Sequence, residues 1–310
     1  MSASASDLRP SFRHEALLYN DQATFLEGTV PFIRDGLAAG EPVLVLETAQ
    51  NIGLLRSQLG QEADQVRFAD MAEVGANPAR IIPAWREFAA QRPHQRLRGI
   101  GEPIWNGRRA AELIECQRHE ALLNAAFASG VEMWLLCPYD TKGLPPAVIA
   151  EARRSHPFIV GGTGGRQSTD YRDPAALFDA ALPESPIESR EHGIEPSTLR
   201  MLRTVVTSAA TQAGLEQGRI ANIVMATNEV ATNSLQHGGG KGTLRLWRDD
   251  GALIIEIRDG GAFDRPLVDR ERPGSEVEAS RGLWLANQLC DLVQIRSYPR
   301  GTVVRLHMWC

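Results

Sequence analysis

Residues 228–238, with the sequence NEVATNSLQHG, carry a glutamate and an asparagine at a spacing that could serve a metal-dependent reaction. Glu229 and Asn233 are four positions apart, so on a helix expected over residues 219–236 they share one face. The carboxylate can act on an attacking hydroxyl, and the carboxamide oxygen can bind Mg²⁺, which prefers a few protein oxygens together with phosphate oxygens and water. The alternative is that both residues only cap or solvate the helix end before Gly238.

Three later segments could bind the parts of a nucleotide. Asp259 ends an expected strand and is followed by glycines, so the backbone can approach a flat ligand and the carboxylate can accept from an exocyclic amine such as that of adenine. Residues 280–283 open an expected helix, whose N-terminus is suited to an anion. Thr302 places a hydroxyl near the start of another strand. Taken singly, these segments also fit an ordinary turn, a plain helix start and an edge strand.

In this order, the four segments resemble the N, G1, G2 and G3 boxes of the GHKL ATPases, and the short domain with one helix before the first box resembles the anti-sigma-factor serine kinases. The resemblance implies that ATP and Mg²⁺ bind here, with Glu229 as the general base and Asn233 as the Mg²⁺ ligand. Residues 264–279 would form the ATP lid. The other nucleotide-binding residues that it implies are Asp259, Gly261, Arg281, Gly282, Leu283 and Thr302.

The same resemblance implies the partners. A kinase of this type phosphorylates a serine or threonine of a STAS-type anti-anti-sigma protein, holds a sigma factor, and is often a homodimer. Phe263 and Ser280 replace glycines that are common in these boxes, which motivates the alternative of an anti-sigma binding module that transfers no phosphate, with or without nucleotide. A histidine autokinase is disfavoured, because only a linker and one helix precede Glu229, and His192 lies in that linker.

The elements that must position these residues form an α+β sandwich over residues 197–310. Apolar spacing and turn residues predict helices over residues 197–213, 219–236 and 282–290, and strand hairpins over 243–259 and 293–308. Residues 182–196, with three prolines and many charges, are expected to be a linker.

Residues 12–181 read as an α/β domain with a doubly wound, mostly parallel sheet, preceded by a disordered tail over residues 1–11. Strands are expected at residues 16–19, 42–47, 66–70, 131–137 and 158–160, with helices between them, the first capped by Asp21. Such alternation is typical of a parallel sheet covered on both faces.

Residues 14–19, 36–43 and 101–105 resemble the MEDS sensory domain, a family similar to RecA-like ATPases that have lost hydrolysis. No Gly-x-x-x-x-Gly-Lys follows the strand at residues 42–47, so we expect no ATP hydrolysis by this domain. One interpretation is a small-molecule or metal pocket containing His14 and His119; the other is a salt-bridged helix surface with a hydrogen-bonded histidine. The candidate pocket residues are His14, Glu102, Trp105, Glu115 and His119.

Charge and cysteine content narrow the classes of partner. The net charge of −5 and the pI near 5.9 provide no basic face for nucleic acid or for an anionic membrane. No apolar run reaches the ~20 residues that a membrane-spanning helix needs. The four cysteines are scattered without paired spacing, which predicts reduced thiols in a cytoplasmic protein.

Overall fold

The computed structural model describes residues 12–161, 165–172, 181–187, 189–262, 265–273 and 278–310, the last without the side chains of residues 278–280. The expected disordered tail, Phe263 and part of the expected ATP lid lie outside these residues. The chain divides into two compact units, Met1–Phe178 and Asp179–Cys310. None of the helices in the described part of the chain combines the length and apolarity needed to cross a bilayer.

Within the described residues, the first unit contains a seven-stranded sheet with the strand order β3-β2-β4-β5-β1-β6-β7. All neighbouring strands are parallel except β7, which runs antiparallel to β6. The strands are β1 (Phe12–Tyr19), β2 (Val43–Glu47), β3 (Val66–Asp70), β4 (Leu97–Gly101), β5 (Met133–Asp140), β6 (Phe158–Val160) and β7 (Gly165–Gln167).

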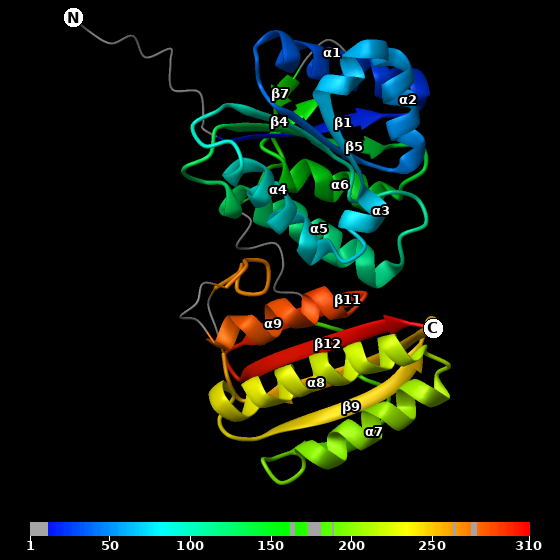
Figure 1. Cartoon of the computed structure of the whole chain (residues 1–310), viewed down its shortest axis with the longest axis vertical. Helices are drawn as coiled ribbons and strands as arrows, with labels where there is room; N and C mark the ends of the chain where they lie inside the picture. The colour runs from blue at the N-terminus through cyan, green and yellow to red at the C-terminus, as the bar shows by residue number, and fades with distance from the viewer. Residues whose placement is uncertain (1–11, 162–164, 173–180, 188, 263–264, 274–277) are drawn as a thin grey trace, which may run out of the picture. The chain divides into compact units, whose positions relative to one another are not determined.

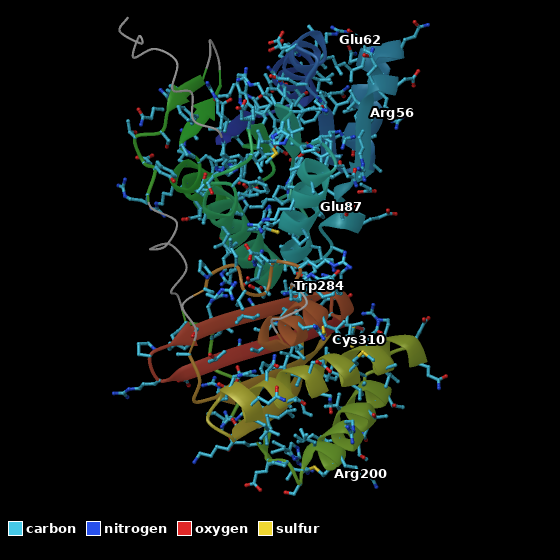
Figure 2. The ribbon with its side chains drawn as sticks, turned by 60° about the vertical axis from the view of Figure 1, so that its left-hand side comes forward. Arg56, Glu62, Glu87, Arg200, Trp284 and Cys310 are labelled. Atoms are coloured by element: carbon cyan, nitrogen blue, oxygen red, sulfur yellow. The ribbon has the colours of Figure 1, made fainter. Side chains whose placement is uncertain are left out.

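Helices cover both faces of this sheet, with α1 and α2 on one side and α4, α5 and α6 on the other (Figure 1). Side chains on the outside, such as Arg56 on α2, extend into solvent (Figure 2). The helical segments are α1 (Gln22–Ala38), α2 (Ala49–Leu59), η1 (Gly60–Gln65), α3 (Met71–Val74), η2 (Pro78–Arg80), α4 (Ile81–Ala90), α5 (Ala110–Ala126) and α6 (Pro146–Ser155).

Local signals account for several of these elements. Asp21 is the N-cap of α1, as expected, and its carboxylate accepts from Thr24 N at 2.8 Å. All five residues of β2 are buried, as expected for a strand covered on both faces. The sequence analysis did not predict strand β4, because glycines within a strand weaken its sequence pattern. Gly99 leaves room for the indole of Trp85, which a Cβ there would approach to 2.7 Å.

In the described part of the second unit, the sheet has five strands in the order β11-β12-β10-β9-β8, all antiparallel to their neighbours. The strands are β8 (Arg190–Ile194), β9 (Gly242–Asp249), β10 (Ala252–Asp259), β11 (Leu292–Tyr298) and β12 (Gly301–Trp309). Asp250 and Gly251 join β9 to β10 with φ angles of 46° and 69°, the left-handed pair that a tight hairpin turn requires.

Among the residues described in this unit, three helices pack on one face of the sheet: α7 (Leu199–Gln212), α8 (Gln217–His237) and α9 (Glu278–Leu289). Their apolar residues, such as Val206, Val230 and Ala286, form one core with Ile255 and Leu306 of the sheet. The sandwich expected from the sequence is therefore present, and it places the ends of α8, β10 and α9 near one another (Figure 1).

The expected linker is partly wrong. Residues 190–194, which the sequence analysis placed in it, form the edge strand β8, paired with β9 from Arg190↔Leu246 to Ile194↔Gly242. Of this strand only Ile194 is buried. An edge strand exposed on its outer side can be polar, so its composition looks like that of a linker.

Candidate functional site

A cavity of about 140 Å³ opens in the second unit beside the C-terminal half of α8. Its walls come from α8, the end of β10, the segment after it, α9 and the start of β12. The lining residues are Val230, Asn233, His237, Gly238, Asp259, Gly261, Ala262, Val268, Leu283, Thr302 and Val304. Most of these are apolar or backbone surface, with a few polar groups among them, the usual character of a small-molecule site.

Asp259, the last residue of β10, is held in one orientation. Its Oδ2 accepts a hydrogen bond from Ser234 Oγ at 2.6 Å, and its Oδ1 accepts from Gly261 N at 2.9 Å. Each carboxylate oxygen has two lone pairs, so both can accept a further bond from a ligand. The carboxylate is thus a preorganised acceptor in the cavity wall.

Glycines allow the end of α8 and the end of β10 to touch. A Cβ on Gly261 would lie 2.6 Å from His237 O, and a Cβ on Gly238 would lie 2.6 Å from Ser234 O and even closer to the Asp259 carboxyl. Gly260 N donates to Gly238 O at 3.0 Å. Any larger residue would push these segments apart and open the wall of the cavity.

Thr302, the second residue of β12, supports the same wall. Its Oγ1 donates to Gly261 O at 2.8 Å, and the residue is only 6% exposed. The hydroxyl therefore acts on the position of Gly261 and, through it, on Asp259.

Asn233 lines the cavity, and Gly282 of α9 packs directly against its side chain. Glu229 lies one turn earlier on α8, is half-buried, and is not part of the cavity lining. Both residues lie within α8, so the four-residue spacing places them on one helix face, as expected.

Helix α9 begins earlier than the sequence indicated. It starts at Glu278 rather than near Gly282. Only the N–H groups of the first turn of a helix lack a partner inside the helix. Gly282 and Leu283 come after that turn, so their N–H groups are directed at backbone carbonyls of α9. Arg281 is exposed, whereas Leu283 is buried and lines the cavity.

The structure therefore brings five sequence-identified residues together around one cavity: Asn233, Asp259, Gly261, Leu283 and Thr302. Sequence reasoning did not identify Ser234, although it orients Asp259. The signal was present, because Ser234 follows Asn233 within the same motif and an interior helical serine faces either solvent or a partner.

A second cavity, of about 370 Å³, lies in the first unit at the carboxyl ends of β1 and β5, next to the residue that follows β4. Ligands of open α/β sheets bind at this edge. Its lining residues are Tyr19, Asn20, Asp21, Gln22, Phe25, Thr48, Gln50, Asn51, Leu54, Glu102, Trp105, Asn106 and Asp140.

Glu102 is the most buried acid of this cavity. It accepts from Tyr19 Oη at 2.8 Å and from Asn51 Nδ2 at 3.0 Å, and Asn51 Nδ2 also donates to Glu47 at 3.1 Å. Burial raises the pKa of Glu102 to about 7, against the lowering effect of its hydrogen bonds. Burial, and then the neighbouring Glu102, also raise the pKa of Glu47 well above its usual value. Glu102 therefore takes up a proton near neutral pH, and burial next to it favours the protonated form of Glu47 as well.

The five residues expected to form a sensory pocket do not share one site. Glu102 and Trp105 line the second cavity. His14 lies instead among buried side chains of β5, α5 and the residue after α6, where burial and then His156 lower its pKa to about 4. Glu115 and His119 are both 1% exposed along α5. A four-residue spacing shows that two residues share a helix face, but not what that face packs against.

Comparison with known families divides the chain in the same way. Residues 13–157 match the model of the MEDS family, described as the MEthanogen/methylotroph, DcmR Sensory domain. Residues 194–308 match the model described as Histidine kinase-like ATPase domain. The chain thus combines a region similar to MEDS with a region similar to histidine-kinase-like ATPase domains.

Among solved structures, the chain is similar to the RsbU and RsbW domains of a Mycobacterium tuberculosis protein. The sequences are 19% identical, the match covers 41% of this chain and 33% of that one, and the TM-score is 0.31. The matched segment thus spans about a third of that chain. No curated protein matches this chain.

Proposed function

We propose that this chain is a two-domain regulatory protein whose second unit binds ATP·Mg²⁺ and phosphorylates a serine or threonine of an antagonist protein, thereby controlling a sigma factor. The match of residues 194–308 to histidine-kinase-like ATPase domains supports a nucleotide site in this unit. The match of residues 13–157 to a sensory family supports a signal-receiving role for the first unit.

The orientation of Asp259 carries the nucleotide proposal. Its carboxylate is fixed from two sides by Ser234 and Gly261, and it faces a cavity whose other walls include Val230, Val268 and Val304. Apolar walls suit the faces of a flat ring, and a carboxylate at one edge suits an exocyclic amine. Adenine has this combination of an apolar face and a donating edge.

Phosphoryl transfer needs a base and a metal ligand on the same side of the nucleotide. In the proposed reaction, the serine oxygen bonds to the γ-phosphorus, the bond from that phosphorus to the β–γ bridging oxygen breaks, and ADP leaves. Glu229 takes the proton of the serine hydroxyl. Asn233 offers a carboxamide oxygen in the cavity wall, a ligand suited to the Mg²⁺ that neutralises phosphate charge when bound.

The partners follow from the proposed reaction. We assign a STAS-type antagonist as the phosphate acceptor. We also assign a sigma factor as the protein that this chain holds or releases, depending on whether the antagonist is phosphorylated. Phosphorylation adds about −1.5 to −2 charges to the antagonist and would break an interface that was complementary before. We propose that the protein acts in the cytoplasm and can pair with a second copy of itself, with neither nucleic acid nor membrane as a direct partner.

Calorimetry of ATP·Mg²⁺ binding tests the site. We expect micromolar affinity in the wild type, and a loss of about ten- to a hundredfold in Asp259→Asn, the size expected when one hydrogen bond to a charged group is lost. Asp249→Asn is the matched control, because Asp249 is exposed at the opposite end of the β9–β10 hairpin. Equal affinity in wild type and Asp259→Asn would contradict the assigned adenine site.

Glu229→Gln separates the kinase from a binding module. If the chain is a kinase, this variant keeps ATP affinity but transfers phosphate to the STAS-type protein at least about a hundredfold more slowly. The motif departures at Phe263 and Ser280 support the alternative of an anti-sigma module without transfer. In that case the wild type binds partner without labelling it, and Glu229→Gln leaves partner binding unchanged.

A further inference from the structure

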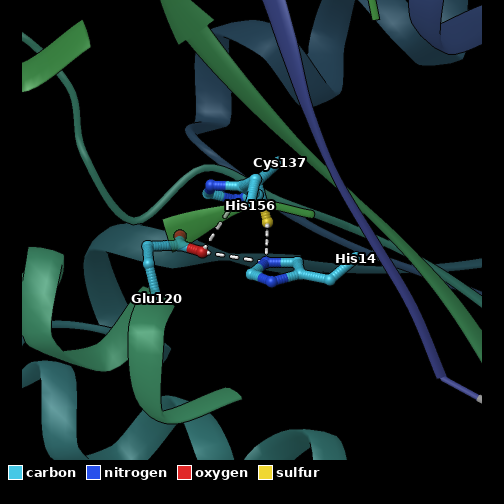
Figure 3. A group of neighbouring side chains, drawn as sticks. All are labelled: His14, Glu120, Cys137 and His156. Carbon is cyan, nitrogen blue, oxygen red and sulfur yellow. Dashed lines mark hydrogen bonds and ion pairs between the residues drawn. The ribbon is translucent and has the colours of Figure 1, made fainter. Parts of the chain in front are cut away.

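Four buried side chains with metal-binding atoms converge inside the first unit (Figure 3). They are His14 on β1, Glu120 on α5, Cys137 on β5 and His156, which follows α6. One ligand atom from each lies within 4.8 Å of every other, and each residue is at most 1% exposed. His14 Nε2 lies 3.1 Å from Glu120 Oε2 and 3.3 Å from Cys137 Sγ, and His156 Nε2 lies 3.2 Å from the same Glu120 oxygen.

The outer nitrogen of each imidazole is already committed as a donor. His156 Nδ1 lies 2.8 Å from the carbonyl oxygen of Ala152, which can only accept, so Nδ1 carries the proton. Asn124 Nδ2 donates to Ser155 O at 2.8 Å, which turns Asn124 Oδ1 toward His14 Nδ1 at 3.1 Å. With Nδ1 as the donor in each ring, the Nε2 atom of each ring is the one that faces the centre of the cluster and can bind a metal ion.

The centre of the cluster contains more hydrogen-bond acceptors than there are protons to share between them. Two imidazole lone pairs and the Glu120 carboxylate meet, and the proton that the four groups supply is that of the Cys137 thiol. Within the described residues, His156 Nε2 and Glu120 Oε1 have no hydrogen-bond partner. Buried polar atoms without partners are costly, so this convergence favours a bound cation, either a further proton or a metal ion, at its centre.

We propose that His14, Glu120, Cys137 and His156 bind a first-row transition-metal dication, with Zn²⁺ as the best fit. Imidazole nitrogen, thiolate sulfur and carboxylate oxygen are the zinc ligands of proteins. Bonds of about 2.0–2.3 Å in a tetrahedron put ligand atoms about 3.3–3.7 Å apart. Three pairs of ligand atoms in this cluster lie 3.1–3.3 Å apart, close to that separation, and all pairs lie within 4.8 Å. The Nδ1–H bonds to carbonyl and carboxamide oxygens are the outer contacts that orient metal-binding histidines.

Charge and enclosure favour the same conclusion. A carboxylate and a thiolate carry two negative charges, which neutralise a divalent ion, so the loaded site buries no net charge. Four protein ligands fill a tetrahedron and leave no position for a substrate, as in structural zinc sites. The ion would tie β1, α5, β5 and the segment after α6 together, so metal occupancy sets the rigidity of the first unit.

Metal content of the full chain tests this directly. The protein is purified after growth with added Zn²⁺, unfolded in guanidinium, and its released metal is measured. We expect about one Zn²⁺ per chain in the wild type. Refolding with Co²⁺ should then produce a sulfur-to-cobalt charge-transfer band, which identifies a thiolate ligand without any substitution.

Cys137→Ser is expected to lose the band and to retain less than about a tenth of the metal, since even outer-contact changes lower metal affinity ten- to a hundredfold. Cys116→Ser is the matched control, because Cys116 is equally buried in the same unit but contacts Pro103 O instead. It should keep both metal and band.

Either of two results would overturn the site. One is a folded wild type that holds less than about a tenth of a metal per chain and binds Co²⁺ without the thiolate band, which would leave a cluster held by protons alone. The other is full metal content in a folded Cys137→Ser protein. If Cys137→Ser does not fold, the cobalt spectrum of the wild type decides.

Discussion

Gly282→Ala should weaken ATP·Mg²⁺ binding by the second unit while leaving the free energy of unfolding of that unit nearly unchanged. Gly282 lies inside α9, and a Cβ there would lie 2.7 Å from Nδ2 of Asn233 and 3.3 Å from its Cγ and Oδ1. Ordinary carbon contacts need about 3.5–4.0 Å, so the Asn233 side chain has to move by about 1 Å. The clash involves the flexible end of a side chain and not backbone, so the fold can accept it.

The two effects of this substitution on stability have opposite signs. Replacing a glycine inside a helix with alanine stabilises by about 0.5–1 kcal/mol, whereas a side chain forced off its rotamer costs about 0.5–1.5 kcal/mol. The free energy of unfolding should therefore stay within about 1 kcal/mol of the wild type. Binding has no such compensation, because a displacement of about 1 Å in a positioned ligand group can cost up to about a hundredfold.

Urea unfolding and calorimetry on the same samples measure both quantities. Gly218→Ala is the control, because Gly218 lies exposed in the first turn of α8 and an added methyl group meets nothing within 4 Å. It should change neither property much. We expect Gly282→Ala to lose at least about tenfold in ATP·Mg²⁺ affinity at nearly unchanged stability. Intact affinity, or a large loss of stability, would refute the argument that Gly282 positions Asn233.

Two further predictions concern single polar groups. Thr302→Val keeps the shape of the side chain but leaves Gly261 O without the 2.8 Å hydrogen bond. The free energy of unfolding, measured by urea denaturation, should fall by about 1–3 kcal/mol, and ATP affinity should fall as well. Unchanged values of both would show that this hydrogen bond contributes nothing. The pKa of Glu102 rises from 4.5 to about 7 on folding, so the folded protein holds this proton more tightly than the unfolded chain. The stabilisation is therefore complete below about pH 4.5 and is lost as the pH rises through 7. Over this range the free energy of unfolding should fall by at most about 1.4 kcal/mol per pH unit. Unfolding measured against pH should show this decline, Glu102→Gln should flatten it, and a wild type with no decline between these pH values would contradict the assignment.

Most individual elements could be predicted because their signals are local. The apolar run of β2, the Asp-Gly turn after β9 and the Asp21 cap each depend on neighbours within a few residues. Strands β4 and β8 carried no such signal. In β4, Gly99 makes room for Trp85, and Arg98 pairs with Glu41 at 2.5 Å inside the unit, so packing partners outweigh a weak strand pattern.

Several residues of the cavity beside α8 could be predicted for a similar reason. Asn233, Asp259, Gly261 and Thr302 each sit within a short motif, and the order of the motifs along the chain indicates that they meet. What the motifs could not show is that α9 already includes Glu278, because a short motif does not mark where a helix boundary falls.

The sequence by itself determined the two-part organisation of the chain and identified five residues that line the cavity beside α8, because both are recorded in contiguous segments. Only the tertiary structure decided that His14, Glu120, Cys137 and His156 meet. His14 and Cys137 are 123 positions apart and come together because β1 and β5 are parallel neighbours in the sheet, with His14 opposite Leu135. No local pattern encodes that neighbourhood, since the order of strands in a sheet is set by packing of the whole unit.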